Sequence, residues 1–184
     1  MSKKKIAVLV GSIRKDSFNK QLAVAIEKIA GGTFEFVHVD IAALPLYNQD
    51  ADAQPVIDSV AALRETIKSS DGVLFVTPEY NRSFSGALKN ALDQGSRPWG
   101  QSVWAGKPAG VIGVSLGAIG TALAQQHLRN VLAYLDMPTL GQPEAFIQYN
   151  EGLFNDDGSI GPDSAEFVGQ WVEAFTAFVN SHGK

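Results

Sequence analysis

The stretch Ile6-Ala7-Val8-Leu9-Val10-Gly11-Ser12 decides the fold, because a continuous apolar run ends there at a glycine and a serine. Runs this short, rich in β-branched residues and without polar alternation, are typical of strands covered on both faces in a parallel sheet. The same character recurs in Gly72-Val73-Leu74-Phe75-Val76-Thr77 and in Ala109-Gly110-Val111-Ile112-Gly113-Val114. These stretches predict the strands of one buried sheet.

Segments with helical spacing separate these strands. Apolar residues recur at helical intervals in three of them: Leu22, Ile26 and Ile29; Val60, Leu63 and Ile67; and Leu123, Leu128, Val131, Leu132 and Leu135. Such stripes predict helices that pack one face on a core. Further strands are predicted at residues 34–39 and, shorter, around 145–147, and an aromatic-rich stripe predicts a last helix over residues 165–179.

The resulting order alternates strand and helix, which predicts an α/β fold with a doubly wound, five-stranded parallel sheet and helices on both faces. No linker-like tract or internal repeat divides the sequence, so residues 1–184 are predicted to form a single domain. Residues 150–163 are rich in turn formers and are predicted to form an exposed excursion.

The composition excludes several classes of function. Fifteen Lys and Arg against nineteen Asp and Glu leave a net charge of −4, which gives no general attraction to nucleic acid or anionic membranes. The chain has no cysteine, so any redox chemistry has to come from a cofactor. The apolar run after the basic start is too short for a signal peptide or a membrane span. We therefore expect a soluble, cytoplasmic protein.

The loop after the first predicted strand, Gly11-Ser12-Ile13-Arg14-Lys15-Asp16-Ser17-Phe18-Asn19, combines hydroxyls, an amide and two cations. Ligands of doubly wound sheets bind beyond the carboxyl ends of the strands, and the first N–H groups of a helix have no internal partner. The loop favours a phosphate monoester; alternatively, Ser17 only caps the helix and Arg14 is solvated. It contains neither the G-x-G-x-x-G of a dinucleotide turn nor the G-K-[ST] of a Walker A loop.

The loops after the third and fourth predicted strands offer groups for a planar ligand. Tyr80 presents an aromatic face and Asn81 an amide, which suit a heteroaromatic ring, or else Tyr80 packs on a helix and Asn81 makes a turn. Gly117 and Gly120 let the backbone approach a ligand closely and bond ring carbonyls, or they form only a flexible turn. Because these loops meet at one end of the sheet, we expect a single site.

The loop residues resemble those of the NADPH-dependent FMN reductase family, most closely its quinone and chromate reductase branch. The resemblance is carried by Gly11-Ser12-Ile13-Arg14, Ser17-Phe18-Asn19, Pro78-Glu79-Tyr80-Asn81, Leu88-Lys89-Asn90-Ala91-Leu92-Asp93 and the loop with Gly117 and Gly120 that precedes Gln126-His127-Leu128-Arg129. It extends from Lys5 to about Phe146 and implies a flavodoxin-like fold.

The same resemblance implies an FMN site with named contacts. The phosphate and ribityl chain are expected at Ser12, Arg14, Ser17, Phe18 and Asn19, and the isoalloxazine ring between Pro78, Glu79, Tyr80 and Asn81 on one side and Ser115 and Gly117 on the other. It also implies a homodimer or homotetramer. Some relatives have an aromatic residue at the position of Arg82 and many have proline at that of Ser85, which bears on substrate preference and subunit contacts.

The activity implied is a two-step hydride relay. NADPH or NADH reduces bound FMN, the nicotinamide leaves, and a quinone, chromate, an azo dye or a free flavin takes its place. The flavin carries the chemistry, so no catalytic acid or base is obligatory. Arg82 is expected to contact the nicotinamide phosphate or an anionic acceptor, or to lie in a subunit interface. A non-catalytic flavin-binding protein or electron carrier is the alternative.

Two tryptophans and three histidines stand outside these motifs. Trp99 and Trp104 are expected to roof the flavin, to lie in an oligomer contact, or to pack within their loop. His38, His127 and His182 are scattered along the chain and show no metal-ligand spacing, so no metal site is expected.

Overall fold

The computed structural model describes residues 3–182, and its centre is a parallel sheet of five strands in the order β2-β1-β3-β4-β5. The strands are β1 (Lys4–Val10), β2 (Phe34–His38), β3 (Gly72–Val76), β4 (Ala109–Ser115) and β5 (Phe146–Gln148). The helices are α1 (Phe18–Ile29), α2 (Asp58–Ser69), α3 (Gly86–Gly95), α4 (Ala122–Tyr134) and α5 (Pro162–His182). Two short 3-10 helices, Ile41–Ala43 and Gln49–Ala53, lie between β2 and α2. This strand order confirms the predicted flavodoxin-like sheet.

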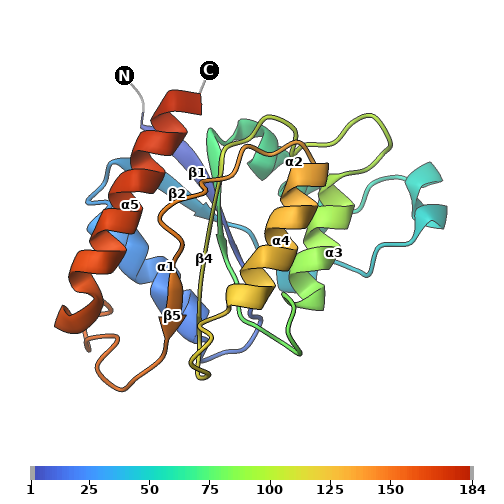
Figure 1. The fold of residues 1–184 in the computed structure, drawn as a ribbon. Helices are drawn as coiled ribbons and strands as arrows, with labels where there is room; N and C mark the ends of the chain where they lie inside the picture. Colours follow the sequence, from blue (N-terminus) through green and yellow to red (C-terminus); the bar gives the residue numbers. More distant parts are fainter. Residues whose placement is uncertain (1–2, 183–184) are drawn as a thin grey trace.

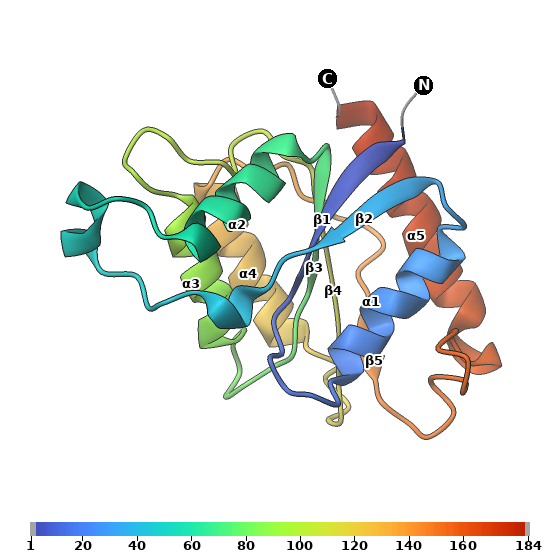
Figure 2. The same cartoon turned by 180° about the vertical axis from the view of Figure 1, so that it is seen from behind.

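Helices cover both faces of the sheet, as Figures 1 and 2 show from opposite sides. Successive residues of a strand point to opposite faces of the sheet, so each central strand contributes side chains to two hydrophobic cores. Val8 and Leu74 contribute to the core under α1 and α5, whereas Leu9 and Phe75 contribute to the core under α2, α3 and α4. The apolar runs of the central strands, which are buried on both faces, follow from this double cover.

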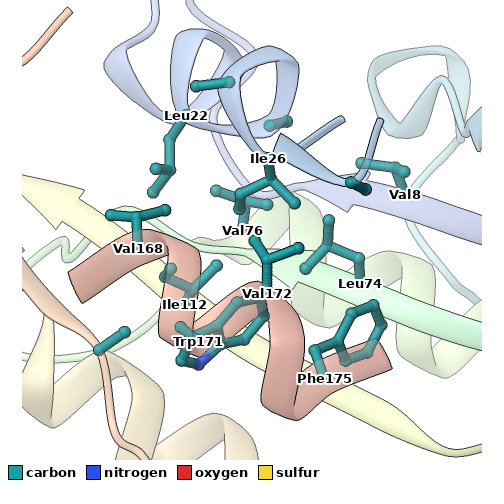
Figure 3. Packing of buried hydrophobic residues seen from close by; sticks show 14 of the residues in the cluster. Val8, Leu22, Ile26, Leu74, Val76, Ile112, Val168, Trp171, Val172 and Phe175 are labelled. Atoms are coloured by element: carbon teal, nitrogen blue, oxygen red, sulfur yellow. The ribbon is translucent and has the colours of Figure 1, made fainter. Parts of the chain in front are cut away.

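The core under α1 and α5 is drawn in Figure 3. Trp171 and Phe175 of α5 stack with ring centroids 5.4 Å apart and face Ile112 of the sheet, while Leu22 and Ile26 descend from α1. The aromatic stripe of the last helix is thus a packing surface, as its spacing predicts. The helix is longer than predicted, since proline is tolerated in the first turn of a helix and Pro162 begins this one.

Residues 150–163 differ in part from the prediction. Glu151 and Asp157 are exposed, but Leu153 and Ile160 are buried in the core under α1 and α5. A bridge between Phe154 and Ile160 closes the segment. The segment is therefore an exposed excursion for most of its length, as predicted, and two apolar residues anchor it to the core.

Trp99 and Trp104 do not roof the loops that follow β1, β3 and β4. Both lie in the connection from α3 to β4, at the opposite edge of the sheet from those loops (Figure 1). Trp104 is fully buried and its Nε1–H donates to the carbonyl of Leu92 at 2.9 Å, which is ordinary packing of a connection. Trp99 is 78% exposed.

Within residues 3–182, no helix has both the length and the apolar character that crossing a membrane requires.

Candidate functional site

A cavity of about 450 Å³ opens where the loops after β1, β3 and β4 come together, at the lower edge of the sheet in Figure 1. The chain leaves β1 for β2 on one side and returns to β3 on the other, so this edge includes the point where the strand order reverses. The predicted site residues that line the cavity are Ser12, Arg14, Ser17, Phe18, Asn19, Pro78, Glu79, Tyr80, Ser115 and Gly117, together with Arg82. Asn81 lies on the same turn but is not part of the lining.

The first wall of the cavity is the start of α1. Ser17 caps this helix, and its hydroxyl accepts from the N–H of Lys20 at 3.3 Å. The N–H groups of Phe18 and Asn19, in the first helical turn, have no intrahelical acceptor. The guanidinium of Arg14 lies 5.2 Å from the Phe18 ring centroid and donates to the carbonyl of Asp16. Free N–H groups, a hydroxyl and a cation therefore meet at one helix N-terminus, a combination that attracts anions.

The amide of Asn19 has a structural use that the sequence did not reveal. Its Nδ2 donates to the carbonyl of Val114 and its Oδ1 accepts from the N–H of Val114, both at 3.0 Å and buried. The side chain thereby ties the start of α1 to the end of β4. The main-chain N–H of Asn19 remains for a ligand.

The second wall is a tight turn after β3. Tyr80 and Ser83 exchange main-chain hydrogen bonds at 2.8 and 3.1 Å, and Asn81 and Arg82 between them have φ values of 50° and 68°. Positive φ at both central residues is the type I′ arrangement. The left-handed conformation costs a residue other than glycine on the order of 1–2 kcal/mol, so Arg82 is held against its backbone preference.

A hydroxyl joins the first wall to the second. Ser85 donates to the carbonyl of Gly11 at 2.6 Å and accepts from the N–H of Leu88 at 3.2 Å, which caps α3. A Cβ at Gly11 would lie 2.9 Å from Cδ of Pro78, so these two loops touch only because glycine stands there. Ser85, at a position where many relatives have proline, therefore provides a hydrogen bond between two loops beside the cavity.

The third wall is the loop from Ser115 to Thr121. A Cβ at Gly113, inside β4, would lie 2.2 Å from the carbonyl oxygen of Thr77, so this glycine is required by packing. Gly117 differs, because a Cβ there meets no protein atom within 4 Å. The space over Gly117 is open, as it has to be if a ligand lies against this wall.

Sequence reasoning missed several contacts that shape the cavity. Tyr149, which follows β5, stacks on Phe18 with ring centroids 3.8 Å apart. Glu79 reaches the first turn of α4, where Leu123 and Ala124 donate to it. Their partners lie far away in the sequence, and no local pattern marks them. Among residues 3–182, no group of His, Asp and Glu side chains is arranged to hold a metal ion.

Comparisons with known proteins point to one family. The family described as NADPH-dependent FMN reductase matches residues 4–152. A 2-hydroxy-1,4-benzoquinone reductase of Burkholderia sp is 52% identical over 176 residues, which cover 95% of this chain and 96% of that protein. A quinone reductase of Pseudomonas putida is 45% identical over 174 residues, with 95% and 94% covered. The solved structure of FerB, a flavoenzyme NAD(P)H:(acceptor) oxidoreductase from Paracoccus denitrificans, matches with a TM-score of 0.95 at 45% identity, over 98% of this chain and 100% of that one.

Proposed function

The chain belongs to the NADPH-dependent FMN reductase family and is an oxidoreductase that uses FMN and NAD(P)H, and we propose that it reduces quinones at the cavity described above. The relatives named as quinone reductases support this acceptor class. The observation that carries the proposal is a cavity whose anion-attracting helix start lies beside open space over a glycine.

The residues of the cavity fit FMN. Its volume of about 450 Å³ lies within the range of roughly 300–1,000 Å³ that is usual for small-molecule sites. We assign the phosphate to the hydroxyls of Ser12 and Ser17, the guanidinium of Arg14 and the N–H groups of Phe18 and Asn19. When bound, FMN supplies hydride acceptance and donation, which no side chain of the chain offers.

The other walls orient the ring and its substrates in this proposal. Pro78, Glu79 and Tyr80 border one side of the ring, with Asn81 at its pyrimidine edge, and Ser115 and Gly117 border the other. Arg82 lines the cavity with a side chain that is 63% exposed, so its charge is available to the phosphate of the nicotinamide donor or to an anionic acceptor.

Donor and acceptor bind in turn over the same face of the bound ring in this proposal, since these loops form one cavity. This order of binding predicts parallel lines when the reciprocal of the initial rate is plotted against the reciprocal of the donor concentration at several fixed acceptor concentrations. A shared, open space also supports chromate, azo dyes and free flavin as acceptors, and either NADPH or NADH as donor.

The assembly proposed is a homodimer or homotetramer of single-domain chains spanning residues 1–184. The five described α-helices pack on one sheet, which supports the single domain. A groove of about 710 Å³ between α3 and α4 supports self-association, because it is lined by Trp99 and Tyr134, each 78% exposed. Use of NAD(P)H supports a cytoplasmic location.

An absorbance spectrum tests the proposal. FMN is added to the purified protein, the mixture is passed through gel filtration, and the protein peak is expected to retain a yellow chromophore. A colourless protein peak would contradict the assignment of the cavity to FMN.

A further inference from the structure

Glu79 connects the second wall of the cavity to the helix that follows the third wall. We propose that Glu79 is a positioning residue for the flavin ring, whose carboxylate fixes the start of α4, and through it the end of the loop of residues 115–121, to the turn of residues 78–83 before the ligand arrives. This inference rests on the proposed function, since it concerns the ring site of that function.

The carboxylate is almost enclosed and is used as a helix cap. Oε2 of Glu79 accepts from the N–H of Leu123 at 3.1 Å and from the N–H of Ala124 at 3.2 Å, and the side chain is only 10% exposed. Both donors belong to the first turn of α4, where a negative charge is favoured by the helix dipole. Charge-assisted bonds of this kind are stronger than neutral ones.

The local sequence gives α4 no cap of its own. Thr121 precedes the helix with φ of 71° and makes no side-chain cap bond, because its buried hydroxyl accepts from Nε2 of Gln125 at 2.9 Å. A cap is normally a Ser, Thr, Asp or Asn directly before the helix. Glu79, which lies 44 positions before Leu123, takes over that task from another loop.

The tip of the loop before α4, residues 116–119, is exposed and is held by few bonds. Gly120 and the hydroxyl of Ser115 both donate to the carbonyl of Gly117, at 3.1 Å each. The ends of the loop are anchored, because Thr121 is fully buried and the carbonyl of Ser115 accepts from the N–H of Tyr149 at 2.8 Å. Gln148 donates to the carbonyl of Leu116 at 3.3 Å. Loss of the Glu79 bonds therefore loosens the start of α4 and leaves the exposed residues 116–119 to be ordered by the ligand, and the free energy of that ordering is subtracted from the binding free energy.

The two carboxylate oxygens have separable roles. Oε2 makes both cap bonds, whereas Oε1 lies 3.6 Å from Nη1 of Arg82. In Glu79→Gln the remaining amide oxygen is able to accept from both N–H groups, but the ion pair with Arg82 is lost. Glu79→Ala removes both, and Glu79→Leu removes both while keeping most of the side-chain volume.

The experiment measures the FMN dissociation constant of the wild type and the three variants by quenching of flavin fluorescence. Loss of a helix cap predicts that Glu79→Ala and Glu79→Leu bind FMN about 10-fold more weakly, and that Glu79→Gln stays within about 3-fold of the wild type. If Glu79→Ala fails to fold, Glu79→Leu gives the same comparison. Two results would overturn the proposal: weak FMN binding by Glu79→Gln, or wild-type FMN affinity in Glu79→Ala and Glu79→Leu, which lack the hydrogen-bond acceptor for Leu123 and Ala124.

Asp71→Ala is the matched control, because Oδ2 of Asp71 accepts from the N–H of Lys5 at 2.7 Å at the opposite edge of the sheet. This variant is expected to lower the temperature of unfolding and to bind FMN within about 3-fold of the wild type, since its lost bond is of similar strength but far from the cavity. An equal loss of FMN binding in Asp71→Ala would show a general effect of stability and would refute the positioning role. Failure of the wild type to bind FMN would instead contradict the proposed function.

Discussion

Replacing Arg14 with alanine is predicted to weaken FMN binding far more than riboflavin binding. The two ligands share the ring and the ribityl chain and differ in the phosphate, which we assign to the start of α1. Arg14 lines the cavity there, and its guanidinium donates to the carbonyl of Asp16 and lies over the Phe18 ring.

The expected size of the effect follows from these contacts. A hydrogen bond to a charged group contributes about 1.5–3 kcal/mol, which corresponds to a loss of roughly 10- to 100-fold in FMN affinity. Riboflavin affinity is expected to change by less than about 3-fold, because its contacts lie on the other walls. The stability of the fold is expected to fall by no more than about 1 kcal/mol, the usual value of an exposed cation–π contact.

The assay is a pair of fluorescence titrations at physiological ionic strength, where distant surface charges are screened over about 8 Å. Lys15→Ala is the control, because Lys15 carries the same charge on the same loop but does not line the cavity. Equal losses for FMN and riboflavin would refute the phosphate assignment. An equal loss in Lys15→Ala would show that general charge, rather than a contact from Arg14, is responsible.

Three further predictions concern the cavity, the core and pH. Gly117→Val is expected to weaken FMN binding by about 10-fold or more because its side chain enters the open space, while Gly86→Ala, also in open space but outside the cavity, is expected to leave FMN affinity unchanged; fluorescence titration compares them. Trp171→Ala is expected to cost about 3–5 kcal/mol in the free energy of unfolding measured in urea, because the indole is fully buried; a loss below about 1 kcal/mol would contradict this packing. The Ser159 hydroxyl and N–H hold the pKa of Asp157 below its usual value of 3.8. The contribution of these bonds to the stability of the fold is therefore present above pH 3.8 and is lost as the pH falls through the folded-state pKa of Asp157. Ser159→Ala is expected to raise the pKa of Asp157 measured by NMR, and an unchanged pKa would refute this cause.

The fold was predictable because the three central strands carry apolar runs that are buried on both faces. The predicted run of residues 6–10 lies within β1, which begins two residues earlier because Lys4 and Lys5 also pair with β2. The predicted run of residues 72–77 matches β3 except for Thr77 at its end. The strand expected around residues 145–147 is found at Phe146–Gln148, because its pairing with the end of β4, rather than its own composition, sets its position.

The site was predictable as a set of loops but not as a network of contacts. Each loop directly follows a strand, so topology alone brings Ser12, Pro78 and Gly117 to one cavity. The bond from Asn19 to Val114 spans 95 positions, and no spacing in the sequence signals it. Nor does any pattern in the sequence indicate that Trp104 is buried, since its indole fills a space that is free only because Gly95 has no side chain.

The most direct test of the central claim is an anaerobic titration of the FMN-loaded protein with NADPH, followed by a benzoquinone. The account predicts that stoichiometric NADPH bleaches the flavin absorbance within the turnover time and that the quinone restores it. A chromophore that stays oxidised with both NADPH and NADH, although FMN is bound, would contradict the account and would favour a non-catalytic flavin-binding protein.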